Sequence, residues 1–129
     1  MPLSFDSSYY LDQYPDVKAA VQSGAIESAE AHWEMYGAAE GRNPNAVFNT
    51  KEYLAANPDV AASGMNPLTH FLQYGAAEGR APSAAYQDVA ANFDNDAYLA
   101  ANPDVAAAVQ SKAIASGYEH WVEYGQFED

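Results

Sequence analysis

Apolar and polar positions along this chain follow the spacing of short helices. Val17 and Val21 are four residues apart, as are Val105 and Val109, so each pair falls on one face of a helix. No segment alternates apolar and polar residues with the period of two that is typical of a half-buried strand. The pattern therefore predicts an all-α fold.

The same pattern occurs three times. Each copy begins at a Phe, continues through Tyr-Leu to Pro-Asp-Val, and later carries a His followed four residues on by Tyr-Gly. The copies begin at Phe5, Phe48 and Phe93, which predicts one domain, 1–129, built of repeats 5–47, 48–92 and 93–129. A unit this small cannot bury its apolar face alone, so we expect a small solenoid or a closed three-unit bundle.

Cap and turn residues divide each repeat into about three short helices. Residues of N-cap type precede the first helix: Asp6, Asn49 or Thr50, and Asp94 or Asn95. The second helix is predicted to begin at Pro15, Pro58 and Pro103, with Asn57 and Asn102 as caps. The third is predicted to end in a left-handed cap at Gly37, Gly75 and Gly125. The junction 81–92, rich in Ala and Ser, predicts an extra helical turn.

These motifs carry a resemblance. The pattern Phe-Asp-x-x-Tyr-Tyr-Leu, Asn/Tyr-Pro-Asp-Val, Asn-Pro-Leu-x-His-Phe and Gly-x-x-Glu-Gly-Arg-x-Pro resembles tandem helical repeats of similar length in bacterial proteins. Such repeats accompany RTX, or hemolysin-type, calcium-binding regions, secreted metalloproteases and some glycosyltransferases. The resemblance covers nearly the whole chain and implies an extracellular or cell-surface location, with a cytoplasmic one left open. It implies no catalytic residues, and the calcium-binding Gly-Gly-x-Gly-x-Asp nonapeptides are missing from this sequence.

Composition removes several classes of partner. The chain has 18 acidic residues against 5 Lys and Arg, a formal charge of -13, which repels phosphates and excludes nucleic acid as an expected partner. No run of 18 apolar residues occurs, so we expect no membrane insertion. The absence of Cys excludes a disulfide framework and a thiolate metal site.

The three aligned histidines, His32, His70 and His120, are the first candidates for chemistry. One interpretation is a metal or acid/base site, since His serves both purposes. The other is a structural His packed between repeats, with its ring nitrogens bonded to backbone or a Tyr hydroxyl. We favour the structural role, because stacked repeats separate equivalent residues and metal ligands must converge.

The Pro-Asp carboxylates form the second group of candidates: Asp16, Asp59 and Asp104. No Asp-x-Asp-x-Asp-Gly loop accompanies them, so we favour acids that stabilise helix starts over calcium ligands. We expect no cofactor and leave weak calcium binding open. Arg42 and Arg80 are predicted to reach a Pro-Asp carboxylate of a neighbouring repeat, and not to face the glutamates two residues before them.

Aromatic side chains provide the candidate ligand surface. Most recur at fixed positions in the repeat, which is typical of core residues. Four fall outside the strictest pattern and are predicted to be surface contacts for a protein or polysaccharide partner: Tyr9, Tyr14, Tyr86 and Tyr118.

The sequence favours a function without catalysis. It contains neither Gly-x-Ser-x-Gly, His-Glu-x-x-His nor a phosphate loop. Our leading hypothesis is a non-enzymatic binding or assembly module of a bacterial surface or secreted protein, with self-association left open. The alternatives are a glycan- or calcium-binding domain that uses surface aromatics and carboxylates and, less favoured, a small hydrolase.

Overall fold

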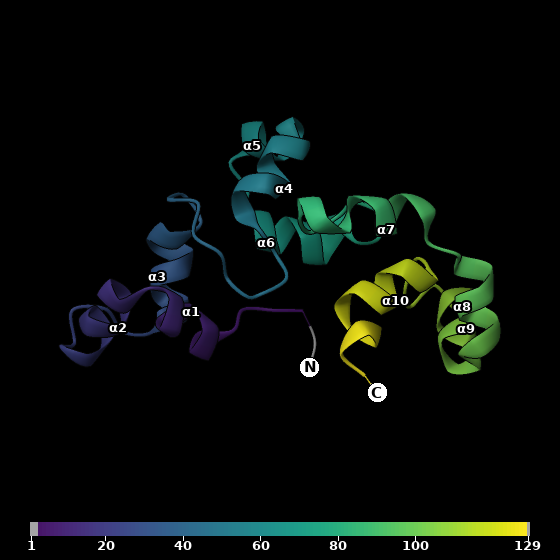
Figure 1. Ribbon diagram of the computed structural model, residues 1–129, viewed down its shortest axis with the longest axis horizontal. Coiled ribbons are helices and arrows are strands. Elements are labelled where there is room, and N and C mark those ends of the chain that lie inside the picture. Colours follow the sequence, from purple (N-terminus) through teal and green to yellow (C-terminus); the bar gives the residue numbers. More distant parts are fainter. Residues whose placement is uncertain (1–2, 129) are drawn as a thin grey trace.

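The computed structural model describes residues 3–128, in which the regular secondary structure is all helical, with no strand in that range. The predicted all-α class is therefore confirmed. Figure 1 shows three groups of helices in chain order. The helices are α1 (Ser7–Gln13), α2 (Pro15–Gln22), α3 (Ala29–His32), α4 (Thr50–Ala56), α5 (Pro58–Ser63), α6 (Pro67–His70), α7 (Gln87–Asn92), α8 (Asn95–Ala101), α9 (Pro103–Gln110) and α10 (Gly117–Glu123).

Side-chain caps fix where the first and third helices of each repeat begin. Asp6, Asn49 and Asp94 accept hydrogen bonds from the backbone N–H three residues on, and so start α1, α4 and α8. Ser28, Asn66 and Ser116 do the same for α3, α6 and α10. The structure thus selects Asn49 over Thr50 and Asp94 over Asn95.

The second helix begins at the predicted proline, but the residue before it does not cap the helix with its side chain. Pro58 and Pro103 are the first residues of α5 and α9, as predicted. The preceding Asn57 and Asn102 do not cap these helices with their side chains. Instead each donates from Nδ2 to a backbone carbonyl of the preceding helix, on Tyr53 and Tyr98 respectively, at 2.8 Å. These side chains therefore stabilise the end of one helix rather than the start of the next.

The third helix also departs from expectation at its end. In repeats 1 and 2 it continues as a π-helical turn, Trp33–Gly37 and Phe71–Gly75. Gly37, Gly75 and Gly125 are not in the left-handed region, so the predicted left-handed caps are wrong. That conformation occurs four residues later in repeats 1 and 2, at Gly41 and Gly79.

A single apolar cluster fills the interior. Phe48, Tyr53 and Phe71 are almost fully buried in repeat 2, and their rings contact one another at centroid distances of 4.9 to 5.7 Å. The Val of each Pro-Asp-Val is also buried, at positions 17, 60 and 105. Repeated aromatic and Val positions thus form the core, as their recurrence predicts.

Equivalent backbone hydrogen bonds connect the start of repeats 1 and 2 to a proline later in the same repeat. The Asp6 N–H donates to the Pro44 carbonyl at 3.0 Å, and the Asn49 N–H donates to the Pro82 carbonyl at 3.0 Å. The Leu3 N–H donates to the Glu123 carbonyl at 2.7 Å, so the N-terminal segment contacts α10 (Figure 1). This contact favours closure, although the choice between a solenoid and a closed bundle stays a prediction.

The second junction contains more structure than the first. Its 3₁₀ turn, Ala84–Tyr86, leads into α7, which confirms the extra helical element predicted there. Tyr86 packs against Trp121 of repeat 3 at a centroid distance of 6.2 Å. None of the helices described in residues 3–128 is long and apolar enough to cross a membrane.

Candidate functional site

Each repeat builds the same arrangement of an inner Tyr, a His and an outer Tyr, which we call the Tyr-His-Tyr set. The inner Tyr is buried in repeats 1 and 2 and half-buried in repeat 3. Its hydroxyl and the His Nδ1 share a hydrogen bond of 2.8, 2.7 and 2.8 Å in repeats 1, 2 and 3. The outer Tyr follows the His by four residues, and its ring lies 5.6 to 5.8 Å from the imidazole. The sets are Tyr10–His32–Tyr36, Tyr53–His70–Tyr74 and Tyr98–His120–Tyr124.

The inner tyrosines remain neutral phenols at physiological pH. Burial raises the pKa of Tyr10 to about 12, with smaller effects from nearby charges. Burial likewise raises the pKa of Tyr53 and of Tyr98. The hydroxyl therefore keeps its proton, and each hydrogen bond to His orients the imidazole rather than supplying a reactive phenolate.

A glycine follows the outer Tyr because the inner Tyr hydroxyl occupies the space of a Cβ. At Gly37, Gly75 and Gly125, an added Cβ would collide with the hydroxyl of Tyr10, Tyr53 and Tyr98 respectively. These glycines are needed for close approach and not for backbone conformation, which corrects the expected left-handed cap.

The three histidines lie in separate hydrogen-bonded sets and do not converge. Each bonds to a Tyr of its own repeat, so the predicted Tyr hydroxyl partner is confirmed, whereas the predicted position between repeats is wrong. Within residues 3–128, no group of three or more His, Asp or Glu side chains is placed to hold a metal ion.

Arg42 and Arg80 each bind the Pro-Asp carboxylate of their own repeat. Arg42 donates to both carboxylate oxygens of Asp16, at 3.0 and 2.8 Å, and from Nε to Glu40 at 2.8 Å. Its guanidinium also lies 4.8 Å from the centre of the Tyr14 ring. The hydrogen bonds from Arg42 lower the pKa of Asp16 to about 2.

Two predictions about these arginines are therefore wrong. The carboxylate belongs to the same repeat, because the turn after the third helix folds back to the start of the second. Arg42 and Arg80 also bond to Glu40 and Glu78, because these residues lie in a turn in which positions two apart face each other.

The predicted surface tyrosines have mostly structural contacts. Tyr118 is only 3% exposed and donates to the Arg80 carbonyl at 2.8 Å, so its assignment to the surface is wrong. It occupies the position of the buried Leu68 in repeat 2. The other three are half-buried: Tyr14 accepts from the Asn43 N–H, Tyr86 donates to Gln126, and the role of Tyr9 stays a prediction.

The exposed tyrosines are instead the outer members of the Tyr-His-Tyr sets. Tyr36, Tyr74 and Tyr124 are 46%, 52% and 45% exposed, and Met35 beside the first is 63% exposed. Because these tyrosines recur at a fixed position in the repeat, the sequence pattern assigned them to the core and not to the surface. Their spacing of four residues from the His was a usable signal, because it places the Tyr ring beside the imidazole on one face of the helix.

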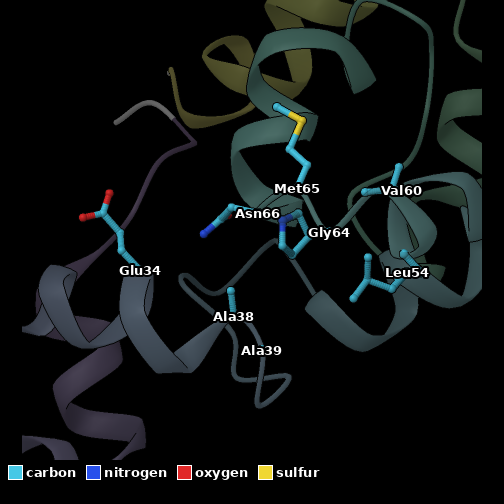
Figure 2. A pocket seen from close by; sticks show the side chains of 10 residues that line it. Glu34, Ala38, Ala39, Leu54, Val60, Gly64, Met65 and Asn66 are labelled. Atoms are coloured by element: carbon cyan, nitrogen blue, oxygen red, sulfur yellow. The ribbon is translucent and has the colours of Figure 1, made fainter.

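A groove of about 320 Å³ lies where repeats 1 and 2 meet. Repeat 1 contributes Glu34, Ala38 and Ala39. Figure 2 shows Ala38 and Ala39 opposite Gly64 and Asn66 of repeat 2, with Glu34 at one edge. The groove lies beside the short connection from α5 to α6 in repeat 2, residues 64–66.

One carboxyl group of α10 has an unusual environment. Glu123 is half-buried, and burial together with the charge of Glu119, four residues earlier, raises its pKa to about 7. Between the ordinary pKa of 4.5 and 7, the folded protein therefore binds more protons than the unfolded chain. Stability contributed by this group accordingly falls as the pH rises through that window.

We expect Glu123→Gln to stabilise the protein above pH 7, where it removes a half-buried charge. After allowance for solvent screening, the gain is about 1 kcal/mol. Urea unfolding at several pH values measures it, and the gain should shrink toward pH 4.5, the ordinary pKa of this group. Glu30→Gln, at an exposed helix position, controls for the loss of one charge. An equal gain in both variants at every pH would contradict this account.

Comparison of the chain with family models, with curated proteins and with solved structures finds no match.

Proposed function

We propose that this chain is a non-enzymatic helical-repeat module that binds a partner or assembles, at a bacterial surface or in the extracellular medium. The location follows from the resemblance to repeats that accompany RTX regions. The binding role is supported by the outer tyrosines of the three Tyr-His-Tyr sets.

The observation that carries the proposal is an exposed ring held in place from below. Each outer Tyr exposes 45% or more of its surface while its ring packs on an imidazole. That imidazole is fixed by a hydrogen bond to the inner Tyr. Aromatic side chains that lose little conformational freedom on binding make effective contacts. Three such rings support a partner surface better than a catalytic centre.

The experiment removes the three outer rings while preserving the hydrogen-bonded Tyr and His beneath each of them. The triple variant Tyr36→Ser, Tyr74→Ser and Tyr124→Ser is compared with the wild-type chain by sedimentation velocity over a range of concentrations and salt. If the chain assembles, association should grow with salt, because screening weakens repulsion between copies of charge -13. The triple variant should then remain monomeric. Val89→Ser, at another exposed apolar position, is the matched control.

Glycan binding is the second candidate, because exposed aromatic rings also stack on sugar rings. A glycan array on the wild-type and triple-variant chains distinguishes the two. Sugar binding that is lost in the triple variant supports the glycan function, and concentration-dependent association without sugar binding supports assembly. A monomeric wild-type chain that binds no glycan, or binding that the triple variant retains, contradicts the role of these tyrosines.

A further inference from the structure

The inner tyrosines of repeats 1 and 2 fix the direction of their hydrogen bonds to histidine. Tyr10 and Tyr53 are 0% and 1% exposed, and within residues 3–128 each hydroxyl has the His Nδ1 as its sole hydrogen-bond partner. Burial raises the pKa of both phenols, so both keep their protons. If Nδ1 donated, the hydroxyl proton would be left in the interior without an acceptor. The hydroxyl therefore donates and Nδ1 accepts.

This direction places the proton of each imidazole on the other nitrogen. A neutral imidazole carries one proton, so His32 and His70 carry theirs on Nε2. Neither Nε2 is hydrogen-bonded to a group within residues 3–128, and no buried side-chain nitrogen in that range lacks a partner. Nε2 therefore reaches solvent in both repeats, and its N–H can donate to a ligand.

The outer tyrosine places an exposed aromatic ring beside this donor. In repeat 2 the ring centroids of Tyr74 and His70 are 5.7 Å apart, and in repeat 1 those of Tyr36 and His32 are 5.6 Å apart. Both outer rings are exposed. Each set thus presents one ring face and one N–H donor within reach of the same small group.

The exposed apolar surface around one set is small. Within residues 48–92, the exposed large apolar side chains are Tyr74 and Val89. A stable protein interface buries about 800 Å² on each partner around an apolar core. A sugar ring needs less, because its C–H groups stack on one aromatic ring and its hydroxyls bond to a few polar groups. The set therefore fits a saccharide unit better than a protein surface.

Charge restricts the class of saccharide. The formal charge of -13 repels uronic acids, sulfates and phosphates. A neutral hydroxyl oxygen accepts from Nε2–H without this repulsion. More than one set in a chain also suits a ligand of repeated units, because linked subsites bind a polymer more tightly than any one of them.

We propose that the Tyr-His-Tyr sets of repeats 1 and 2 are subsites for a neutral polysaccharide, whose sugar ring stacks on the outer Tyr and accepts a hydrogen bond from His Nε2–H. The inference rests on the proposed binding function and names its ligand class. Tyr10 and Tyr53 are positioning residues that hold the imidazole in its donating form. The assignment covers repeats 1 and 2, because the half-buried Tyr98 of repeat 3 can bond to water instead.

The proton position is tested without a ligand. Long-range ¹H–¹⁵N correlation NMR of the full chain distinguishes a protonated from an unprotonated imidazole nitrogen. At about pH 8, above the ordinary pKa of His, we expect Nε2 of His32 and His70 to be protonated and Nδ1 to be unprotonated. A proton on Nδ1 of either residue would overturn the proposal.

Saccharide binding is tested with neutral linear oligosaccharides of glucose, galactose, mannose and N-acetylglucosamine, and with oligogalacturonate as the acidic control. Binding to the full chain is followed by NMR at the Tyr36 and Tyr74 rings. We expect saturable shifts at both rings with at least one neutral compound and weaker binding of the acidic one at low salt. No saturable binding of any neutral compound, or tighter binding of oligogalacturonate, would overturn the proposal.

His70→Asn separates the N–H donor from the aromatic ring. Asn Oδ1 can replace Nδ1 as the acceptor for Tyr53, but Asn has no group at the position of Nε2. We expect about two- to tenfold weaker binding at the Tyr74 ring and unchanged binding at the Tyr36 ring, which serves as the control within the same molecule. His32→Asn should do the reverse. Equal affinity at Tyr74 in wild type and folded His70→Asn would contradict the role of the donor.

Failure of this inference can be distinguished from failure of the proposed function. If the chain associates through its outer tyrosines but binds no neutral saccharide, the saccharide inference is wrong and the binding role of the tyrosines stands. If the chain binds no saccharide and stays monomeric, both are wrong. Saccharide binding that is lost in the triple Tyr→Ser variant and weakened by His70→Asn supports both.

Discussion

Gly75→Ala will destabilise the protein by about 3 kcal/mol, since overpacking at this position also disturbs a buried hydrogen bond. The new Cβ would collide with the Tyr53 hydroxyl and lie 3.0 Å from a ring carbon of Phe71. Both rings are almost fully buried, so neither can move aside without opening the core. Urea unfolding followed by circular dichroism measures the loss.

Two further variants separate the collision from general effects of Gly→Ala. Gly79→Ala lies in the same turn with open space around it, and its φ of +81° costs about 1 kcal/mol in a residue with a Cβ. Adding Tyr53→Phe to Gly75→Ala removes the colliding oxygen and should recover part of the loss. If Gly75→Ala costs no more than Gly79→Ala, the close approach does not constrain this position.

The sequence predicted helix boundaries well because their signals are local. Asp6, Asn49 and Asp94 bond to backbone within three residues, and Pro58 and Pro103 fix the backbone at their own positions. Such signals depend little on the rest of the fold.

The candidate site was harder to predict because its partners are far apart in the chain. Tyr10 and His32 are 22 residues apart, and Arg42 and Asp16 are 26 apart. Which of two tyrosines reaches the His in the interior depends on how the first and third helices pack. The need for Gly37 likewise arises from a hydroxyl on another helix. Local patterns gave these residues but not their roles.

A tyrosine that recurs in every repeat was expected to be buried, and one that does not recur was expected to be exposed. The structure contradicts both expectations. Tyr118 breaks the pattern and is buried, whereas Tyr74 follows it and is exposed. A residue can recur because every repeat needs it for some role, and that role can be at the surface. An irregular position can equally be a contact made at one junction only, as Tyr118 makes with Arg80.

Replacing the histidines one at a time should give three separate losses of stability. His70→Ala leaves the Tyr53 hydroxyl without its partner in the core, which costs about 1 to 3 kcal/mol. His32→Ala should cost the most, because Tyr10 and His32 are both buried. His120→Ala should cost the least, because Tyr98 and His120 are only half-buried and water can replace the lost partner.

The triple His variant decides between three structural sets and one shared site. Because the sets share no hydrogen-bond partner, the three losses should add to within about 0.5 kcal/mol. A metal site would behave differently, since the first substitution would abolish metal-linked stability and the others would add little. Thermal and urea unfolding of the three single variants and the triple variant, with and without a chelator, measure this. Marked non-additivity together with sensitivity of the wild-type chain to chelator would show that the histidines act as a single site.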